Sequence, residues 1–136
     1  MSAPPVPTAD GVVTKPSPRS APETVRRLTY LVLEKGLTVF ALVDHSGEAA
    51  KAGLAMPDTK LLEFGSPVAG TPVMVAARLA ALDLPLKVLV WANEDGAAFV
   101  SYNSPRYLAT RYTLTDELSA RLEAIDAITD AAVAPS

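Results

Sequence analysis

Two apolar segments, 86–93 and 97–103, are separated by only three residues, Glu94, Asp95 and Gly96. Asp-Gly is typical of a tight β-turn, because glycine adopts the positive φ that such a turn requires. Segments joined in this way pair as an antiparallel hairpin, and two strands alone are too few for a stable fold in water. The sequence therefore predicts a β-sheet that contains this hairpin and is covered by helices.

Helical and extended segments alternate along the rest of the chain. Ser20 and Glu23 form a capping box in front of a helix, and Gly36 is suited to end it. We expect strands over 11–14, 37–43 and 60–64, and helices over 21–35, 47–55, 71–82 and 115–128. The order β-α-β-α-β-α-β-β-α favours an α/β (α+β) two-layer sandwich, with one sheet of about four to five strands.

Three segments carry more specific expectations. Strand 11–14 is expected at a sheet edge, because Pro16 and Pro18 follow it at once. Strand 37–43 is apolar on both alternating faces, which indicates an interior strand or a dimer contact. The helix that Thr71 and Pro72 would open as N-cap and first residue is apolar nearly all round, and we expect it to be buried.

Length and composition indicate one domain with a flexible beginning. The chain has 136 residues, 49% of them apolar, which suffices for one core. Six of the twelve prolines lie within the first 22 residues. We expect a disordered tail over 1–10, a single domain over 11–130 and a flexible C-terminus over 131–136.

Charge and residue inventory exclude several classes of protein. The net charge is −3, and the twelve Lys and Arg are scattered, which argues against a dedicated nucleic-acid binder. The chain has no cysteine, which excludes structural disulfides, thiolate-bound zinc, iron–sulfur clusters and cysteine nucleophiles. No uncharged stretch is long enough to span a membrane, and residues 1–10 do not resemble a secretory signal, so we expect a cytoplasmic protein.

His45 is the single histidine, and it stands between Asp44 and Ser46 where a predicted strand ends. Neighbouring residues on an extended chain point to opposite faces, so these three side chains cannot line up as a hydrolase triad. Two roles remain open. His45 either caps the short helix or bonds across a dimer interface, or it acts as acid or base in a small-molecule site, because it titrates near neutral pH.

A metal site around His45 is the weaker alternative. Glu48 lies one helical turn from His45, and Asp44, Asp58 and Glu63 are the further oxygen ligands that a divalent cation would use. A single histidine supplies only one nitrogen ligand, whereas protein metal sites usually combine several His or Cys ligands. We therefore expect no metal, and the sequence identifies no cofactor.

Segment 65–72 has two glycines five residues apart in front of a predicted helix, as a phosphate loop does. No lysine follows Gly70, and Pro67 and Pro72 remove backbone donors that such a loop would direct at phosphate. A structural turn with a capped helix is the favoured interpretation. A weak anion site at the start of that helix remains open.

Lys87, Tyr102 and Asn103 are the other candidates for a ligand site. Lys87 lies in an otherwise apolar strand, where it is either a surface residue or a charge directed into a pocket. Tyr102 and Asn103 end the paired strand, so they could meet Lys87 at one rim of the sheet; alternatively, Asn103 merely stops the strand. Trp91 and Phe99 are expected to pack across the hairpin.

Several sequence blocks, taken together and in this order, resemble the domain-of-unknown-function family 302. They are Gly36-Leu37-Thr38-Val39-Phe40, Asp44-His45, Phe64-Gly65-Ser66-Pro67, Gly70-Thr71-Pro72, Asp83-Leu84-Pro85-Leu86-Lys87 with Trp91, and Ser101-Tyr102-Asn103-Ser104-Pro105. Ser66 stands where the family pattern leads us to expect Asn, so no role is assigned to that side chain. The resemblance covers about residues 11–128. It implies a small, mostly bacterial and archaeal α/β fold that forms dimers, and it implies no activity.

Two functional hypotheses follow. The first is a homodimeric module that binds a small molecule or a protein partner without catalysis, with no nucleic-acid or membrane partner. The alternative is a small enzyme of unknown reaction class, whose site is built from His45, Lys87, Tyr102 and Asn103. They differ in whether His45 lies in a cleft near Lys87 or Tyr102.

Overall fold

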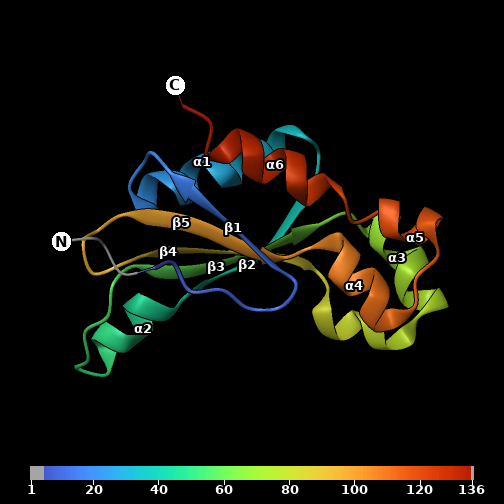
Figure 1. Ribbon diagram of the computed structural model, residues 1–136, viewed down its shortest axis with the longest axis horizontal. Coiled ribbons are helices and arrows are strands. Elements are labelled where there is room, and N and C mark those ends of the chain that lie inside the picture. The colour runs from blue at the N-terminus through green and yellow to red at the C-terminus, as the bar shows by residue number, and fades with distance from the viewer. Residues whose placement is uncertain (1–4, 136) are drawn as a thin grey trace.

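Five strands form one sheet in the computed structural model, which describes residues 5–135 (Figure 1). The strands are β1 (Val12–Ser17), β2 (Thr38–Asp44), β3 (Thr59–Gly65), β4 (Leu86–Ala92) and β5 (Ala98–Asn103). Their order across the sheet is β1-β5-β4-β3-β2, and every neighbouring pair is antiparallel. The expected α+β architecture with one sheet of four to five strands is confirmed.

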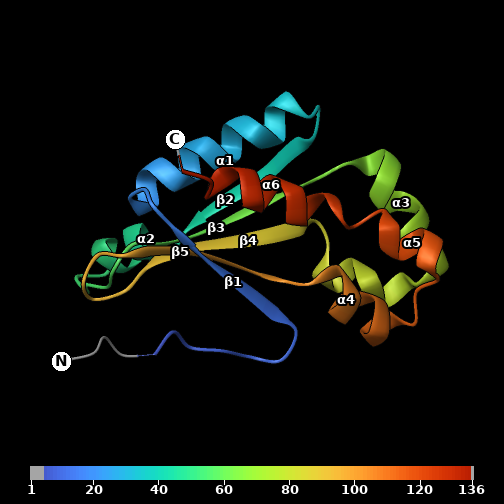
Figure 2. The same ribbon diagram turned by 45° about the horizontal axis from the view of Figure 1, so that its top comes forward.

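Two helices cover one face of the sheet, and a second group of helices lies beyond one of its ends (Figures 1 and 2). The covering helices are α1 (Ala21–Glu34) and α6 (Ala124–Ala132), which lie side by side. The others are α2 (His45–Lys51), α3 (Pro67–Ala76), the 3-10 helix η1 (Arg78–Asp83), α4 (Pro105–Tyr112) and α5 (Asp116–Ala120). Of these, α3, η1, α4 and α5 gather near the end of β3 and the start of β4. Among residues 5–135, the structure has no helix with the length and hydrophobicity that a membrane span requires.

The predicted hairpin is confirmed. β4 and β5 pair around the turn at Asp95-Gly96, and Gly96 has the positive φ of +84° that the turn demands. Trp91 pairs with Phe99, and their rings stack with centroids 4.8 Å apart. Cross-strand aromatic packing of this kind stabilises an antiparallel pair.

Local signals also fixed the first helix and the first strand. The Ser20 hydroxyl accepts a hydrogen bond from the Glu23 amide at 3.3 Å, as the capping box predicts. β1 lies at a sheet edge as expected, and it extends through Pro16, which pairs with Phe99. An edge position tolerates proline because the missing N–H faces away from the sheet.

The expectation that strand 37–43 is an interior strand is wrong. In the described sheet β2 pairs with β3 alone and forms the edge opposite β1. Phe40 is 51% exposed and Leu42 is 47% exposed, and a bulge lies between Val39 and Ala41. Apolar residues on both faces of a strand cannot distinguish a covered strand from an edge strand that leaves them exposed.

The helix expected over 71–82 begins earlier and is not buried. Ser66 is its N-cap and accepts a hydrogen bond from the Ala69 amide at 3.2 Å, so Pro72 lies inside α3. After α3 the chain continues as η1. Val73 and Ala80 are the buried residues of these two helices, whereas four large apolar side chains are at least 70% exposed: Val68, Val75, Leu79 and Leu82.

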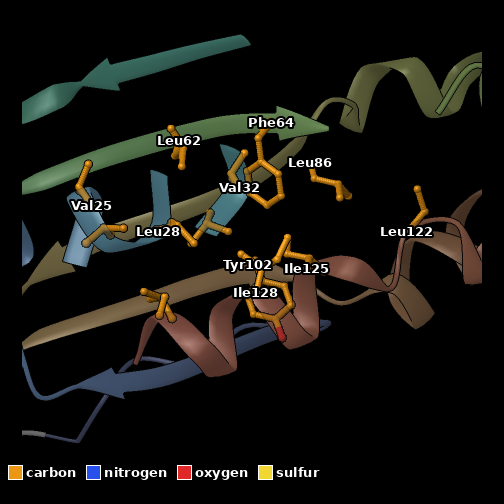
Figure 3. Packing of buried hydrophobic residues seen from close by; sticks show 14 of the residues in the cluster. Val25, Leu28, Val32, Leu62, Phe64, Leu86, Tyr102, Leu122, Ile125 and Ile128 are labelled. Atoms are coloured by element: carbon orange, nitrogen blue, oxygen red, sulfur yellow. The ribbon is translucent and has the colours of Figure 1, made fainter. Parts of the chain in front are cut away.

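The core lies between the sheet and the helices α1 and α6 (Figure 3). Its largest fully buried side chains include Leu28 of α1, Phe64 of β3 and Ile128 of α6. The final helix expected over 115–128 is divided into α5 and α6, but its apolar stripe is retained, because Leu122 and Ile125 are buried. Helix α6 therefore packs near β5, where Asp126 bonds to Tyr102, and α1 packs across β2, β3, β4 and β5.

The expected domain limits remain predictions. The sequence analysis placed the domain over 11–130, with flexible segments before and after it. Residues 1–4 and 136 lie outside the described residues. Among the described residues, 5–7 line a groove together with Trp91 and Phe99. At the other end of the domain, α6 continues to Ala132.

Candidate functional site

A cavity of about 380 Å³ opens where β3 ends and β4 begins. Its walls come from β2, α3, the η1–β4 connection and the end of α5. Seven of its lining side chains are apolar or aromatic and larger than alanine: Phe40, Pro67, Met74, Leu84, Pro85, Leu86 and Leu122. Apolar cavities of this size with a few polar groups are typical of small-molecule sites.

Helix α3 forms one wall of the cavity, and its interior proline shapes that wall. Pro72 has no N–H, so the Val68 carbonyl lacks its usual partner four residues ahead. The Arg121 guanidinium donates to this carbonyl at 3.5 Å and thereby joins the end of α5 to the first turn of α3. The guanidinium consequently lies at the wall of the cavity.

Two glycines in the wall have no conformational reason to be glycine. Gly65 ends β3 and Gly70 lies in α3, and neither has a positive φ. A Cβ at Gly65 would lie 3.9 Å from Pro85 and 4.0 Å from Phe40, and one at Gly70 would lie 4.0 Å from Met74. These are ordinary contact distances, so alanine would fit at both. The missing side chains leave space inside the cavity.

The other described glycines have different reasons for lacking a side chain. Four adopt positive φ, and Gly47 is too close to Asp44 for a Cβ; the four are Gly11, Gly36, Gly53 and Gly96. Glycine inside a helix costs about 1 kcal/mol relative to alanine. Gly70 therefore lowers the stability of α3, and the absence of its side chain leaves space in the cavity.

The cavity carries one kind of charge. Arg121 is the charged residue among the described residues that line it, and no Asp or Glu belongs to the same lining. Ser66 and Thr71 add hydroxyl groups, although the Ser66 oxygen already caps α3. The site is therefore apolar with a positive rim.

The sequence analysis did not select this cavity, although a signal for it was present. Nine of the thirteen lining residues belong to the sequence blocks on which the family resemblance was based. Most of these blocks are far apart in the chain, and the pattern around Gly65 and Gly70 favours a structural turn rather than a cavity wall. The family blocks were therefore the sequence signal that could have found the site, because only the structure shows that Gly65 and Gly70 lack a positive φ.

His45 lies elsewhere. It begins α2 at the end of β2, whereas Phe40 of the same strand reaches the cavity. Its side chain is exposed, and the helix cap is Asp44, which accepts a hydrogen bond from the Gly47 amide at 2.9 Å. This amide, together with the Lys60 ammonium, holds the pKa of Asp44 below its ordinary value.

Three of the four carboxylates considered as metal ligands pair with lysines instead. Asp44 pairs with Lys60 at 3.3 Å, Glu48 with Lys51 at 3.1 Å and Glu63 with Lys87 at 3.7 Å; Asp58 is exposed. Within residues 5–135 no group of three or more His, Cys, Asp or Glu is placed to hold a metal ion.

Lys87 and Tyr102 do not meet at one rim of the sheet, which corrects that expectation. Alternation along β4 and β5 places them on opposite faces. Lys87 pairs with Glu63 on the face away from α1, whereas the Tyr102 hydroxyl donates to Asp126 of α6 at 2.6 Å. Asn103 is exposed at the end of β5. The structure therefore does not gather His45, Lys87, Tyr102 and Asn103 into one cleft.

Tyr102 belongs to a polar network that joins β1, β5 and α6. The Lys15 ammonium lies 5.1 Å from the centroid of the Tyr102 ring, donates to Thr129 at 2.7 Å and pairs with Asp130 at 2.8 Å. Burial raises the pKa of Tyr102, and its bond to Asp126 adds to this. Burial opposes the charge of Lys15, but its contacts with Asp130 and Tyr102 outweigh that effect and raise its pKa.

This network predicts a loss of stability at alkaline pH. Because both folded pKa values are raised, the contributions of Lys15 and Tyr102 are complete below their unfolded values of about 10 and are lost as pH rises through the folded values. Urea unfolding between pH 8 and 11 should show a falling free energy of unfolding. The fall should be smaller in Lys15→Met and Tyr102→Phe, and unchanged in Lys51→Met. Equal slopes in all four proteins would contradict the assignment.

Comparison with known proteins identifies related sequences and related solved structures. The family model described as "Domain of unknown function DUF302" matches residues 13–132. A crystal structure of an uncharacterized conserved DUF302 protein from Bacillus stearothermophilus has a TM-score of 0.74 and 20% identity, and the similarity covers 92% of this chain and 97% of that one. The match confirms the fold.

Curated relatives are longer than this chain. The fluoride-specific ion channel FluC 1 of Brucella suis biovar 1 is 39% identical over 104 residues, which is 76% of this chain and 41% of the channel. FluC 2 of Brucella melitensis biotype 1 is also 39% identical over 104 residues, which is 38% of its length. This chain thus spans about two fifths of these relatives, and the channel activity is not carried over to it.

Proposed function

The chain belongs to the domain-of-unknown-function family DUF302. From the geometry of its cavity, we propose that it is a small-molecule-binding module without catalysis. The observation that carries the proposal is the cavity of about 380 Å³ with Gly65 and Gly70 in its wall. A folded chain gains dispersion energy by filling such space, so an open apolar cavity with two dispensable glycines favours a ligand as its occupant.

Filling the cavity should abolish binding without unfolding the protein. A Cβ at Gly65 points between Phe40 and Pro85, so the Gly65→Leu side chain would occupy the cavity. In a thermal-shift screen of apolar and amphipathic metabolites, a ligand at 100 times its Kd adds about 2.7 kcal/mol, which raises Tm by several degrees. We expect that rise in the wild type and its absence in Gly65→Leu.

Two variants serve as controls for this screen. Gly65→Ala fits at ordinary contact distances, so it should retain most of the shift. His45→Ala should retain all of it, because His45 begins α2 at the end of β2 away from the cavity. A shift that is lost in His45→Ala and kept in Gly65→Leu would reject this proposal and favour the alternative, a small enzyme with a His45-centred site.

We further propose that two copies associate through β2 to form a homodimer. An edge strand presents unpaired N–H and C=O groups, and protective charges or prolines normally block such an edge. From Thr38 to Val43 this edge has no charge and no proline, and it exposes Phe40 and Leu42; its one irregularity is the bulge between Val39 and Ala41. Antiparallel pairing of β2 with its copy obeys a two-fold axis, which closes the assembly at two subunits.

A lysine on the β2 edge should separate the two subunits. Leu42→Lys introduces a charge into the proposed contact, whereas Leu79→Lys places the same charge on the exposed side of η1. Analytical ultracentrifugation should find a dimer for the wild type and Leu79→Lys and a monomer for Leu42→Lys. A monomeric wild type, or a dimer that Leu79→Lys disrupts and Leu42→Lys does not, would refute association through β2.

A further inference from the structure

We propose that the cavity takes an amphipathic carboxylate, whose apolar body lies against Phe40, Met74 and Leu122 and whose carboxylate bonds to Arg121; this inference rests on the proposed binding function. The lining combines large apolar side chains with one cation and, within the described residues, no carboxylate. A neutral apolar ligand would satisfy the walls but would leave the guanidinium unused. A cationic ligand would be repelled.

The guanidinium of Arg121 has donors to spare. It carries five N–H groups, and its recorded contact is one bond of 3.5 Å to the Val68 carbonyl. That bond is long, so it is a weak competitor for a ligand. None of the described ion pairs includes Arg121. A carboxylate accepts two parallel bonds from a guanidinium, which makes this group a good match in both charge and shape.

The first turn of α3 adds potential of the same sign. Ser66, Pro67, Ala69 and Gly70 line the cavity, and they form the N-terminal end of a ten-residue helix. The dipole of such a helix favours negative charge near this end. An anion bonded to Arg121, which itself contacts the first turn through Val68, benefits from both effects.

The volume limits the apolar body of the ligand. A water molecule occupies about 30 Å³ in the liquid, so about 380 Å³ accommodates about a dozen non-hydrogen atoms. The cavity opens between separate elements, and Gly65 and Gly70 widen it on two sides. A medium-chain fatty acid or a small aryl acid has the required size and a single carboxylate.

Octanoate and 1-octanol test the inference because they share a chain and differ in charge. Both are titrated into the full chain and followed by ¹H–¹⁵N NMR shifts, which report dissociation constants in the millimolar range expected for ligands this small. In the wild type, octanoate should bind about tenfold more tightly than octanol, because a hydrogen bond to a charged group supplies about this factor. In Arg121→Gln, the two should bind almost equally.

Controls separate the ligand class from the site. Arg26→Gln removes an exposed arginine on α1, away from the cavity, and should behave as the wild type does. Gly65→Leu should weaken both ligands. Equal binding of octanoate and octanol to the wild type, or an octanoate preference that survives in Arg121→Gln, would overturn the carboxylate assignment and leave the binding function standing. If neither ligand binds and the thermal-shift screen also finds none, both proposals fail.

Discussion

Replacing Phe64 by alanine should lower the free energy of unfolding by about 3 to 5 kcal/mol. Phe64 lies in β3 with no exposed surface, on the face that α1 covers, and it pairs with Leu86 of β4. The substitution removes the largest fully buried side chain of the core and leaves a cavity that neighbouring strands cannot close. Urea unfolding followed by circular dichroism measures the change.

The matched control is Leu82→Ala. Leu82 is also a large apolar residue, but it is 72% exposed on η1, so its truncation should change the free energy of unfolding by less than about 0.5 kcal/mol. The contrast tests the finding that the chain after β3 is apolar without being buried. A loss at Leu82 comparable to that at Phe64 would show that η1 is covered in solution.

Replacing Gly11 by alanine should lower the free energy of unfolding by roughly 2 kcal/mol or more. Its φ of +77° is unfavourable for any residue with a Cβ, and that Cβ would lie 2.7 Å from the Tyr107 Cβ and closer still to the aromatic ring. The Gly11 carbonyl also accepts a hydrogen bond from the Ser104 amide at 2.8 Å. The clash would therefore separate β1 from the start of α4.

Gly36→Ala isolates the backbone part of this effect. Gly36 has nearly the same φ, +75°, but a Cβ there would meet nothing within 4 Å. It should cost about 1 kcal/mol, the strain of the positive φ alone. Chemical denaturation of the two variants gives the difference. If Gly36→Ala proves as costly as Gly11→Ala, the contact with Tyr107 contributes nothing to stability.

Most of the candidate site could not be predicted from the sequence. The sequence favours four candidates because their polar side chains can act on or bind a ligand: His45, Lys87, Tyr102 and Asn103. The cavity depends instead on Gly65 and Gly70, which contribute space, and on walls from four separate parts of the chain. Space between distant segments leaves no periodic pattern in a sequence.

The features that were correctly predicted from the sequence depend on local interactions. The Ser20 cap, the Asp95-Gly96 turn and the positive φ of Gly36 all involve residues within a few positions of one another, so their effects are readable from neighbouring letters. Together with the alternation of segments, they sufficed for the α+β class and for the hairpin that anchors the sheet.

Which apolar segments are buried depends on contacts between elements far apart in the chain. The sequence predicts that the segments 37–43 and 71–82 are buried, because they are rich in apolar residues. In the structure β2 is an edge strand, and α3 and η1 leave Val75 and Leu79 exposed. The hydrophobic effect makes the burial of an apolar side chain favourable in free energy, but it is non-directional and does not select the neighbour that covers the side chain. That choice depends on strand order and helix placement, which are set by contacts between residues far apart in the chain.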